Sequence, residues 1–240
     1  MSLDLKCLVI TGASAGIGLA TAGRFLAEGF RVVNISRRPC PADGVVQLSA
    51  DLGDSTSLEG IRASLEAAVS GASRVVVIHN AARMLKDTVE TMDDAALRAV
   101  FEVNLVAPNT LNRMLLPHMR AAPARNGSAI LYVGSTLSEK AVPGSFSYVT
   151  SKHALIGMMR ATCQDLAGSG IHTACICPGF TDTEMLRKHV PADAMGAVSV
   201  MSAFGRLIDP GEIAETLRWA ADNPVINGAV IHANLGQVER

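Results

Sequence analysis

Short apolar runs rich in β-branched residues recur along the chain, and segments with helical spacing separate most of them. Strands that alternate with helices predict right-handed βαβ units and therefore a parallel sheet. Several runs, Val75–Ile78 above all, are apolar throughout, which is typical of strands covered by helices on both faces. We expect the strands at Leu8–Ile10, Arg31–Ser36, Val45–Leu48, Arg74–His79, Ala129–Gly134, Ile171–Ile176 and Ala229–His232.

Local signals mark where several helices begin and end. The first helix is expected to open in a glycine-rich turn after the first strand and to end at Gly29. Thr56 and Glu59 have capping-box spacing, which predicts the start of a helix that runs towards Val69. Asp209, followed by a proline and a glycine, supplies the N-cap of another helix.

The segment Phe180–Phe204 connects the sixth strand with the helix that begins after Asp209. It is long and rich in Met, Thr and Ala. A connection of this length inside a compact domain is usually a lid or a binding loop. We therefore expect residues 180–204 to form a substrate loop.

The composition excludes several classes of protein. Hydrophobic residues make up 49% of the 240 positions and charged residues 18%, which excludes an intrinsically disordered chain. The formal net charge is −1, so no overall field favours nucleic acid or anionic lipid. No apolar run is long enough to span a bilayer, and the N-terminus lacks a signal-peptide pattern. These features predict a cytoplasmic protein without a nucleic-acid or membrane partner.

The five cysteines form no recognisable framework. Their odd number fits a reducing compartment. Cys175 and Cys177 share a strand face, but no two further zinc ligands at suitable spacing accompany them. We expect buried free thiols and no metal site.

The first strand leads into the glycine-rich turn Thr11–Gly18 and then into a helix. The glycine spacing matches neither G-x-G-x-x-G nor a P-loop. Glycines nevertheless let the backbone approach a diphosphate, and a helix N-terminus offers free N–H groups and a positive dipole end. The turn therefore predicts a dinucleotide site, and an ordinary tight strand-to-helix turn is the alternative.

The second strand ends in Ser36, Arg37 and Arg38. An acidic residue at this point of a Rossmann-like fold binds the adenosine ribose and repels a 2′-phosphate. Here that carboxylate is missing, and guanidinium groups suit bidentate phosphate binding. We therefore expect NADP(H) in preference to NAD(H), the alternative being two solvated surface arginines.

Tyr148 and Lys152 are four residues apart and lie on one face of a predicted helix. A phenol has a pKa near 10, and a neighbouring ammonium favours the phenolate, so the pair can act as a general acid/base. Ser135 follows the fifth strand, where a hydroxyl can bond a substrate carbonyl. Its surroundings lack the G-x-S-x-G elbow that a nucleophilic serine would have.

Asn104 lies in a predicted helix four residues before Pro108. Because proline has no N–H, it cannot donate to the main-chain carbonyl of Asn104. If the helix continues, that carbonyl needs another donor, such as an ordered water. An exposed mid-helix asparagine beside an incidental proline is the alternative.

Together these segments resemble the short-chain dehydrogenase/reductase family, in its compact single-domain branch. The resemblance covers nearly all of the chain and implies a Rossmann-like α/β fold in one domain, residues 1–240. That fold is a doubly wound parallel sheet of about seven strands with helices on both faces. The matching motifs are Thr11-Gly12-x3-Gly16-x-Gly18, Asp51-Leu52, Asn80-Ala81-Ala82, Asn104, Ser135, Tyr148-x3-Lys152 and Pro178-Gly179-x3-Thr183.

The resemblance also implies the roles of the four catalytic residues. Tyr148 would exchange a proton with the substrate oxygen, and Lys152 would lower the pKa of Tyr148 and bind the nicotinamide ribose. Ser135 would polarise the carbonyl, and Asn104 would hold a relay water through its main-chain carbonyl. The motifs and the resemblance together predict cofactor contacts from Gly12, Ser14, Ala15, Gly16, Ile17, Gly18, Ser36, Arg37, Arg38, Asp51, Leu52, Asn80, Ala81, Tyr148, Lys152, Pro178, Gly179, Thr181 and Thr183.

The predicted function is NADP(H)-dependent hydride transfer between nicotinamide and a ketone or secondary alcohol. The alternative is a non-catalytic NADP(H)-sensing or scaffold protein on the same fold, because a fold does not fix a function. The resemblance further implies a small-molecule carbonyl or alcohol substrate and a homodimer or homotetramer.

Overall fold

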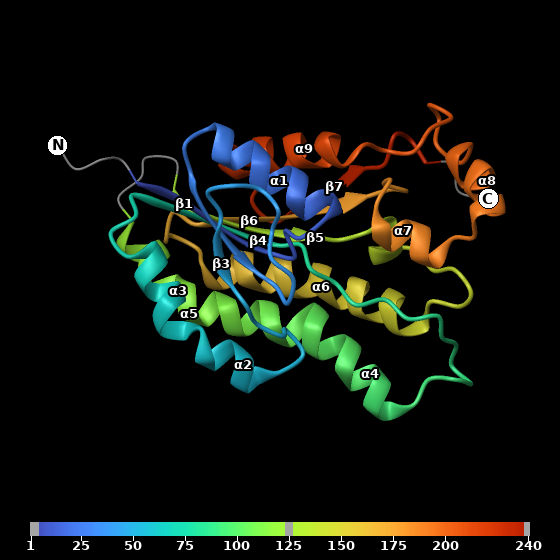
Figure 1. Cartoon of the computed structure of the whole chain (residues 1–240), viewed down its shortest axis with the longest axis horizontal. Coiled ribbons are helices and arrows are strands. Elements are labelled where there is room, and N and C mark those ends of the chain that lie inside the picture. The colour runs from blue at the N-terminus through green and yellow to red at the C-terminus, as the bar shows by residue number, and fades with distance from the viewer. Residues whose placement is uncertain (1–4, 123–126, 238–240) are drawn as a thin grey trace.

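The computed structural model describes residues 5–122 and 127–237 of the chain. Their strands form one seven-stranded parallel sheet in the order β3-β2-β1-β4-β5-β6-β7 (Figure 1), which confirms the predicted Rossmann-like architecture in a single domain. Each predicted strand is present, with boundaries that differ from the prediction by at most two residues. The strands are β1 Lys6–Thr11, β2 Arg31–Ile35, β3 Val46–Leu48, β4 Arg74–His79, β5 Ala129–Val133, β6 His172–Pro178 and β7 Ala229–Ala233.

Helices cover both faces of this sheet (Figure 1). Helices α1 and α9 pack on one face, and α2, α3, α5 and α6 lie on the other. The α-helices are α1 Gly16–Ala27, α2 Ser55–Gly60, α3 Arg62–Val69, α4 Asp94–Phe101, α5 Ala107–Ala121, α6 Phe146–Asp165, α7 Glu184–His189, α8 Met195–Ser199 and α9 Pro210–Asp222. A π-helical turn at Glu102–Val106 joins α4 to α5, and 3₁₀ turns occupy Thr136–Ser138, Ala192–Ala194 and Pro224–Ile226.

Successive strand residues point into two separate cores. In β1, Leu8 and Ile10 pack with Phe25 of α1, whereas Cys7 and Val9 pack with the opposite core. All of these side chains are fully or almost fully buried. The covering of both faces explains why the central strands show no polar alternation.

The start of α2 differs from the sequence prediction. Asp54, not Thr56, is the N-cap, because its carboxylate accepts a hydrogen bond from the Thr56 N–H at 2.9 Å. The helix also breaks at Ile61, so α2 and α3 replace one continuous helix. The N-cap predicted at Asp209 is confirmed, and the structure adds a capping box, in which the Glu212 carboxylate accepts the Asp209 N–H at 2.9 Å.

Residues 180–204, which we expected to form a loop, contain regular secondary structure. They contain α7, a 3₁₀ turn and α8, which lie together at one end of the sheet (right in Figure 1). An isolated parallel bridge joins Thr181 to Ile208, just before α9. Within the described ranges, no helix has the length and apolarity needed to cross a membrane.

Candidate active site

The glycine-rich turn leads directly into the N-terminus of α1. The N-cap is Ala15, which has no side chain to accept a hydrogen bond from the first N–H groups of the helix. No acidic residue lies in the first turn. The positive end of a 12-residue helix is therefore left for an external anion.

Asn80 holds this turn in place from β4. Its amide Nδ2 donates to the carbonyl oxygens of Thr11 and Gly12 at 3.0 and 3.1 Å. In return, the Thr11 hydroxyl oxygen accepts the N–H groups of Asn80 and Ala81, each at 3.0 Å. The Nδ2 group of Asn80 thus positions the turn.

Asn34 is a second support of the turn that sequence analysis missed. Its fully buried amide accepts from the Ala13 N–H at 2.9 Å and donates to the Ser36 hydroxyl at 2.9 Å and to Gln47 at 2.8 Å. It therefore ties the glycine-rich turn to the residues that follow β2. A polar residue inside an otherwise apolar strand was the available signal.

The two arginines after β2 lie at the surface in ion pairs. Arg37 pairs with Asp51 at 3.9 Å, and Arg38 pairs with Glu184 of α7 at 3.0 Å. Leu52, beside Asp51, is buried. The structure therefore brings the predicted residues Arg37, Arg38 and Asp51 together. It also adds the carboxylate of Glu184, which sequence analysis did not identify.

Tyr148 and Lys152 lie on the first two turns of α6, and both side chains are buried. The Lys152 ammonium donates to the main-chain oxygen of Val133 in β5 at 2.6 Å and lies 5.5 Å from the centre of the Tyr148 ring. Among the described residues, no carboxylate forms an ion pair with Lys152. Since an ammonium has three donors, this buried lysine retains hydrogen-bonding capacity for a ligand.

Ser135 lies two residues beyond the Val133 oxygen that holds Lys152. It caps the 3₁₀ turn Thr136–Ser138, because its hydroxyl oxygen accepts the Leu137 N–H at 3.1 Å. That turn packs against α6, the helix of Tyr148. The hydroxyl hydrogen of Ser135 remains available to a substrate oxygen.

Gly134 is required beside Ser135 because two sulfurs fill the adjacent space. A Cβ at residue 134 would lie 2.7 Å from the Cys177 sulfur and 2.8 Å from the Cys175 sulfur. The two sulfurs are 3.8 Å apart. Their mutual hydrogen bond, together with burial, raises the pKa of Cys175. The described cysteines are free and buried, as predicted, and the described residues hold no cluster of three or more metal-ligating groups.

Asn104 lies in the π-helical turn, and its side chain is hydrogen-bonded to two other segments. It accepts the Arg83 N–H at 2.7 Å and donates to the Arg83 oxygen at 3.0 Å and to the Ser151 hydroxyl at 2.9 Å. Ser151 in turn donates to the main-chain oxygen of Tyr148 at 2.8 Å. Asn104 therefore fixes the segment after β4 against the helix that carries Tyr148.

Asp87 is another anchor of α6 that the sequence did not reveal. Its buried carboxylate accepts the main-chain N–H of Ser147 at 3.0 Å and also the Ser147 hydroxyl. Its own N–H donates to the Gly144 oxygen at 3.1 Å. Because Ser147 precedes Tyr148, this carboxylate stabilises the helix turn that presents the phenol.

The last predicted contacts follow β6. Thr181 is buried and donates to the Gly179 oxygen at 3.1 Å. Thr183 is the N-cap of α7, with its hydroxyl oxygen accepting the Leu186 N–H at 3.2 Å. Its methyl group is 3.0 Å from the position of a Cβ at Gly16. The start of α7 therefore touches the glycine-rich turn, although 167 residues separate Gly16 from Thr183.

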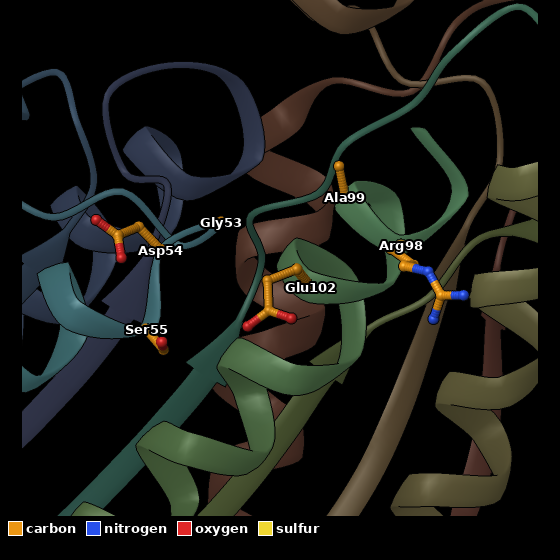
Figure 2. Close-up of a pocket in the computed structure, with 6 residues that line it drawn as sticks. All are labelled: Gly53, Asp54, Ser55, Arg98, Ala99 and Glu102. Carbon is orange, nitrogen blue, oxygen red and sulfur yellow. The ribbon is translucent and has the colours of Figure 1, made fainter. Parts of the chain in front are cut away.

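An open pocket of about 430 Å³ lies next to this region (Figure 2). Gly53, Asp54 and Ser55 line it on one side, and Arg98, Ala99 and Glu102 face them from α4 and the π-helical turn. None of these residues belongs to the predicted site. The pocket borders the segment of Asp51 and Leu52, and the acidic side chains of Asp54 and Glu102 make it unsuited to a phosphate.

The residues present fit a dinucleotide. The uncapped N-terminus of α1 suits a diphosphate, and the buried ammonium of Lys152 has donors left for ribose hydroxyls. Gly18 allows the close packing of the turn, because a Cβ there would lie 2.2 Å from the Gly12 oxygen and 2.6 Å from Asn80 Nδ2. These groups together are therefore a candidate cofactor site.

The close packing at Gly18 leads to a testable prediction. Gly18→Ala should lower the free energy of unfolding by about 2 kcal/mol, because the added methyl must displace the Gly12 backbone. Gly23→Ala is the matched control in the same helix, where a Cβ meets nothing within 4 Å. It should raise stability by about 0.5–1 kcal/mol. Urea denaturation measures both, and equal stabilities of the two variants would contradict the packing argument.

Comparison with known proteins agrees with this geometry. The sequence profile described as short chain dehydrogenase matches residues 6–194. The chain is 30% identical over 243 residues to cis-4-hydroxycyclohexanecarboxylate dehydrogenase of Sinomonas cyclohexanicum, which covers 96% of each protein. It is also 30% identical over 249 residues to 3-oxoacyl-(acyl-carrier-protein) reductase of Thermotoga maritima, covering 99% of this chain and 100% of that protein.

Solved structures share the fold at lower identity. A 4-hydroxyisoleucine dehydrogenase complexed with NADH has a TM-score of 0.86 and 24% identity over 96% of this chain and 98% of that one. ElxO with NADP bound has a TM-score of 0.84 and 22% identity, covering 97% and 98%. With a family profile that spans most of the chain and relatives that match it nearly end to end, this protein belongs to the short-chain dehydrogenase/reductase family of oxidoreductases.

Proposed function

We propose that this protein is an NADP(H)-dependent oxidoreductase that interconverts a ketone and a secondary alcohol. The observation that carries the proposal is the buried Lys152 ammonium, held by the Val133 oxygen at 2.6 Å beside the ring of Tyr148. A buried cation next to a phenol, with donors to spare, suits proton transfer and ribose binding. The two relatives are named as a dehydrogenase of a hydroxy acid and a reductase of a 3-oxoacyl group, which agrees with either direction.

The residues of the site divide the chemistry among them. NADP(H), when bound, supplies or accepts the hydride. Tyr148 gives its phenolic proton to the carbonyl oxygen during reduction and takes it back during oxidation. The positive charge of Lys152 favours release of that proton. The Ser135 hydroxyl donates to the substrate oxygen and polarises the carbonyl.

Asn104 serves the proton path through its main chain. Its side chain is already bonded to Arg83 and Ser151, so the main-chain carbonyl is the group that would hold a water. Pro108 cannot donate to that carbonyl, and the π-helical turn at Glu102–Val106 widens the helix at this point. The carbonyl would hold a water that returns protons from solvent to Lys152.

The positions of the predicted site residues suggest how the cofactor would be held. The turn from Gly12 to Gly18 and the N-terminus of α1 would bind the diphosphate, with Thr181 and Thr183 on its other side. Arg37 and Arg38 would bind the 2′-phosphate, and Leu52 and Asp51 the adenine. Residues 180–204 would cover the substrate, because α7 begins directly after Thr183.

NADPH oxidation with a panel of ketones, diketones, 3-oxoacyl thioesters and sugars tests the activity. Turnover of at least one class that is lost in Tyr148→Phe would support the proposal. Tight NADPH binding without turnover of any class would favour the non-catalytic alternative.

Replacement of both arginines tests the cofactor preference. Arg37→Ala together with Arg38→Ala should raise the dissociation constant of NADPH by 10-fold or more, because charge-assisted bonds to the 2′-phosphate are lost. The dissociation constant of NADH should change by less than about twofold, since NADH has no such phosphate. Fluorescence titration measures both, and equal losses would contradict a 2′-phosphate site at these residues.

A further inference from the structure

The ion pair between Arg38 and Glu184 joins two distant parts of the chain. Arg38 Nη2 lies 3.0 Å from Glu184 Oε2, although 146 residues separate the two positions. Arg38 follows β2, and Glu184 is the first residue of α7. The side chains are 65% and 67% exposed, so a ligand can reach both of them.

Both partners are anchored on the glycine-rich turn. On the Arg38 side, the Ser36 hydroxyl donates to the Arg38 oxygen at 2.5 Å, and Asn34 connects Ser36 to the Ala13 N–H. On the other side, Thr183, next to Glu184, touches the Cβ position of Gly16 at 3.0 Å. Residues close to both partners therefore contact the turn that would receive the cofactor phosphates.

We propose that Glu184 is a selectivity residue, which competes with the 2′-phosphate of NADP(H) for the guanidinium of Arg38. The inference rests on the proposed function, because it assumes that Arg38 receives that phosphate. NAD(H) has a hydroxyl at this position and leaves the ion pair intact. Glu184 therefore weakens the binding of NADP(H) relative to NAD(H) and reduces the preference for NADP(H) that the two arginines create. Glu184, the first residue of α7, loses its ion pair only when NADP(H) is bound.

The competition follows from charge and geometry. A guanidinium binds a carboxylate or a phosphate through N–H donors along an edge of its plane, so a phosphate on the edge that carries Nη2 competes with Glu184 for Arg38. When the phosphate takes Arg38, the Glu184 carboxylate loses its partner and is left near a second anion. Exposed ion pairs contribute little free energy, so the expected effect on affinity is moderate.

Glu184→Gln tests the inference by direct binding, without turnover. The dissociation constants of NADPH and of 2′,5′-ADP should each fall about two- to fivefold. Those of NADH and 5′-AMP should stay within about 1.5-fold of the parent protein. Fluorescence titration serves the dinucleotides and calorimetry the fragments. Weaker binding of NADPH to Glu184→Gln would overturn the inference, because Glu184 would then be orienting Arg38 for the phosphate.

Two further variants separate competition for Arg38 from a general charge effect. Asp182→Asn removes a carboxylate two residues away that pairs with Arg187 at 2.6 Å, and it should leave the ratio of NADPH to NADH affinity unchanged. Glu184→Gln should have no effect on NADPH binding when Arg38 is already replaced by Gln. A gain of the same size in that background, or from Asp182→Asn, would overturn the inference.

The same experiments distinguish failure of this inference from failure of the proposed function. If Arg38→Gln weakens NADPH selectively but Glu184→Gln changes nothing, the NADP(H) preference stands and the competition does not exist. If Arg38→Gln affects NADPH and NADH equally, the 2′-phosphate is not bound there, and the proposed preference and the inference both fail.

Discussion

We expect Tyr148→Phe to lower kcat by about 1,000-fold or more while leaving the dissociation constant of NADPH within about threefold of the parent value. The variant removes one oxygen from a ring that is otherwise buried on the first turns of α6. General acid/base catalysis contributes about 10²- to 10⁴-fold in enzymes, and the loss of the only phenol beside Lys152 removes it entirely. Single-turnover and steady-state measurements with an active ketone, together with fluorescence titration of NADPH, check the two parts.

The second tyrosine of the chain provides a matched control. Tyr132 is also buried, but its hydroxyl accepts from Asn112 Nδ2 at 2.9 Å and lies 3.3 Å from the Thr162 hydroxyl, within the core between β5 and α5. Tyr132→Phe should keep kcat within about twofold and lower the free energy of unfolding by about 1 kcal/mol. If Tyr148→Phe retains more than a tenth of the parent kcat, Tyr148 is not the proton donor.

The fold was readily predicted because its signals are local. An apolar run such as Val75–Ile78 reports burial on both faces by itself, and no contact with the rest of the chain is needed to recognise it. The N-cap at Asp209 is equally local, since its carboxylate accepts the Gly211 N–H only two residues away. The N-cap predicted at Thr56 was wrong, because the Asp54 carboxylate accepts the Thr56 N–H and the helix therefore begins earlier.

The candidate site was predicted as a set of residues, and its supports were not. The spacing of Tyr148 and Lys152 follows from the helix itself, whereas the bond from Lys152 to the Val133 oxygen depends on the packing of α6 on β5. The contacts of Asn34, Asp87 and Glu184 join segments up to 146 residues apart. The spacing of hydrophobic and polar residues cannot predict such pairs, because each partner taken alone is an ordinary polar residue.

The side chain of Asn104 makes contacts that its motif does not reveal. The proline four residues later predicted a free main-chain carbonyl, which is a local argument. The bonds of its amide to Arg83 and Ser151 fix two other elements and could not be read from the spacing. Asn104 therefore also positions the segments of Arg83 and Ser151, a role that the motif alone does not predict.

The burial of His79 predicts a loss of stability in mild acid. Burial lowers the pKa of His79 to about 4 from the usual 6.5, although the hydrogen bond to Asn112 opposes this. The Nε2 atom lies 2.8 Å from the Asn112 oxygen, and Nδ1 has no partner among the described residues. Protonation would therefore place a second N–H in the core, beside the ring of Tyr132 at 5.1 Å, without an acceptor.

The sign follows from the difference between the two states. Between pH 6.5 and 4 the unfolded chain binds a proton at His79 that the folded chain does not, so acid stabilises the unfolded state. The stability that neutral His79 provides should be fully present above pH 6.5, and the free energy of unfolding should decrease as the pH falls towards 4. At about 1.4 kcal/mol per pKa unit, the loss by pH 4.5 is about 2–3 kcal/mol.

His79→Gln tests this assignment, because glutamine can still donate to Asn112 and does not titrate. Urea denaturation at pH 7.5, 6.0 and 4.5 should show a decrease in unfolding free energy about 2–3 kcal/mol smaller for His79→Gln than for the parent chain. His172, whose pKa burial also lowers, contributes to the remaining slope in both proteins. His153→Gln, at an exposed position on α6, is the matched control and should keep the parent slope. Parallel pH dependences of the parent and His79→Gln would show that His79 reaches solvent or finds an acceptor when protonated, and the acid sensitivity would then belong to other groups.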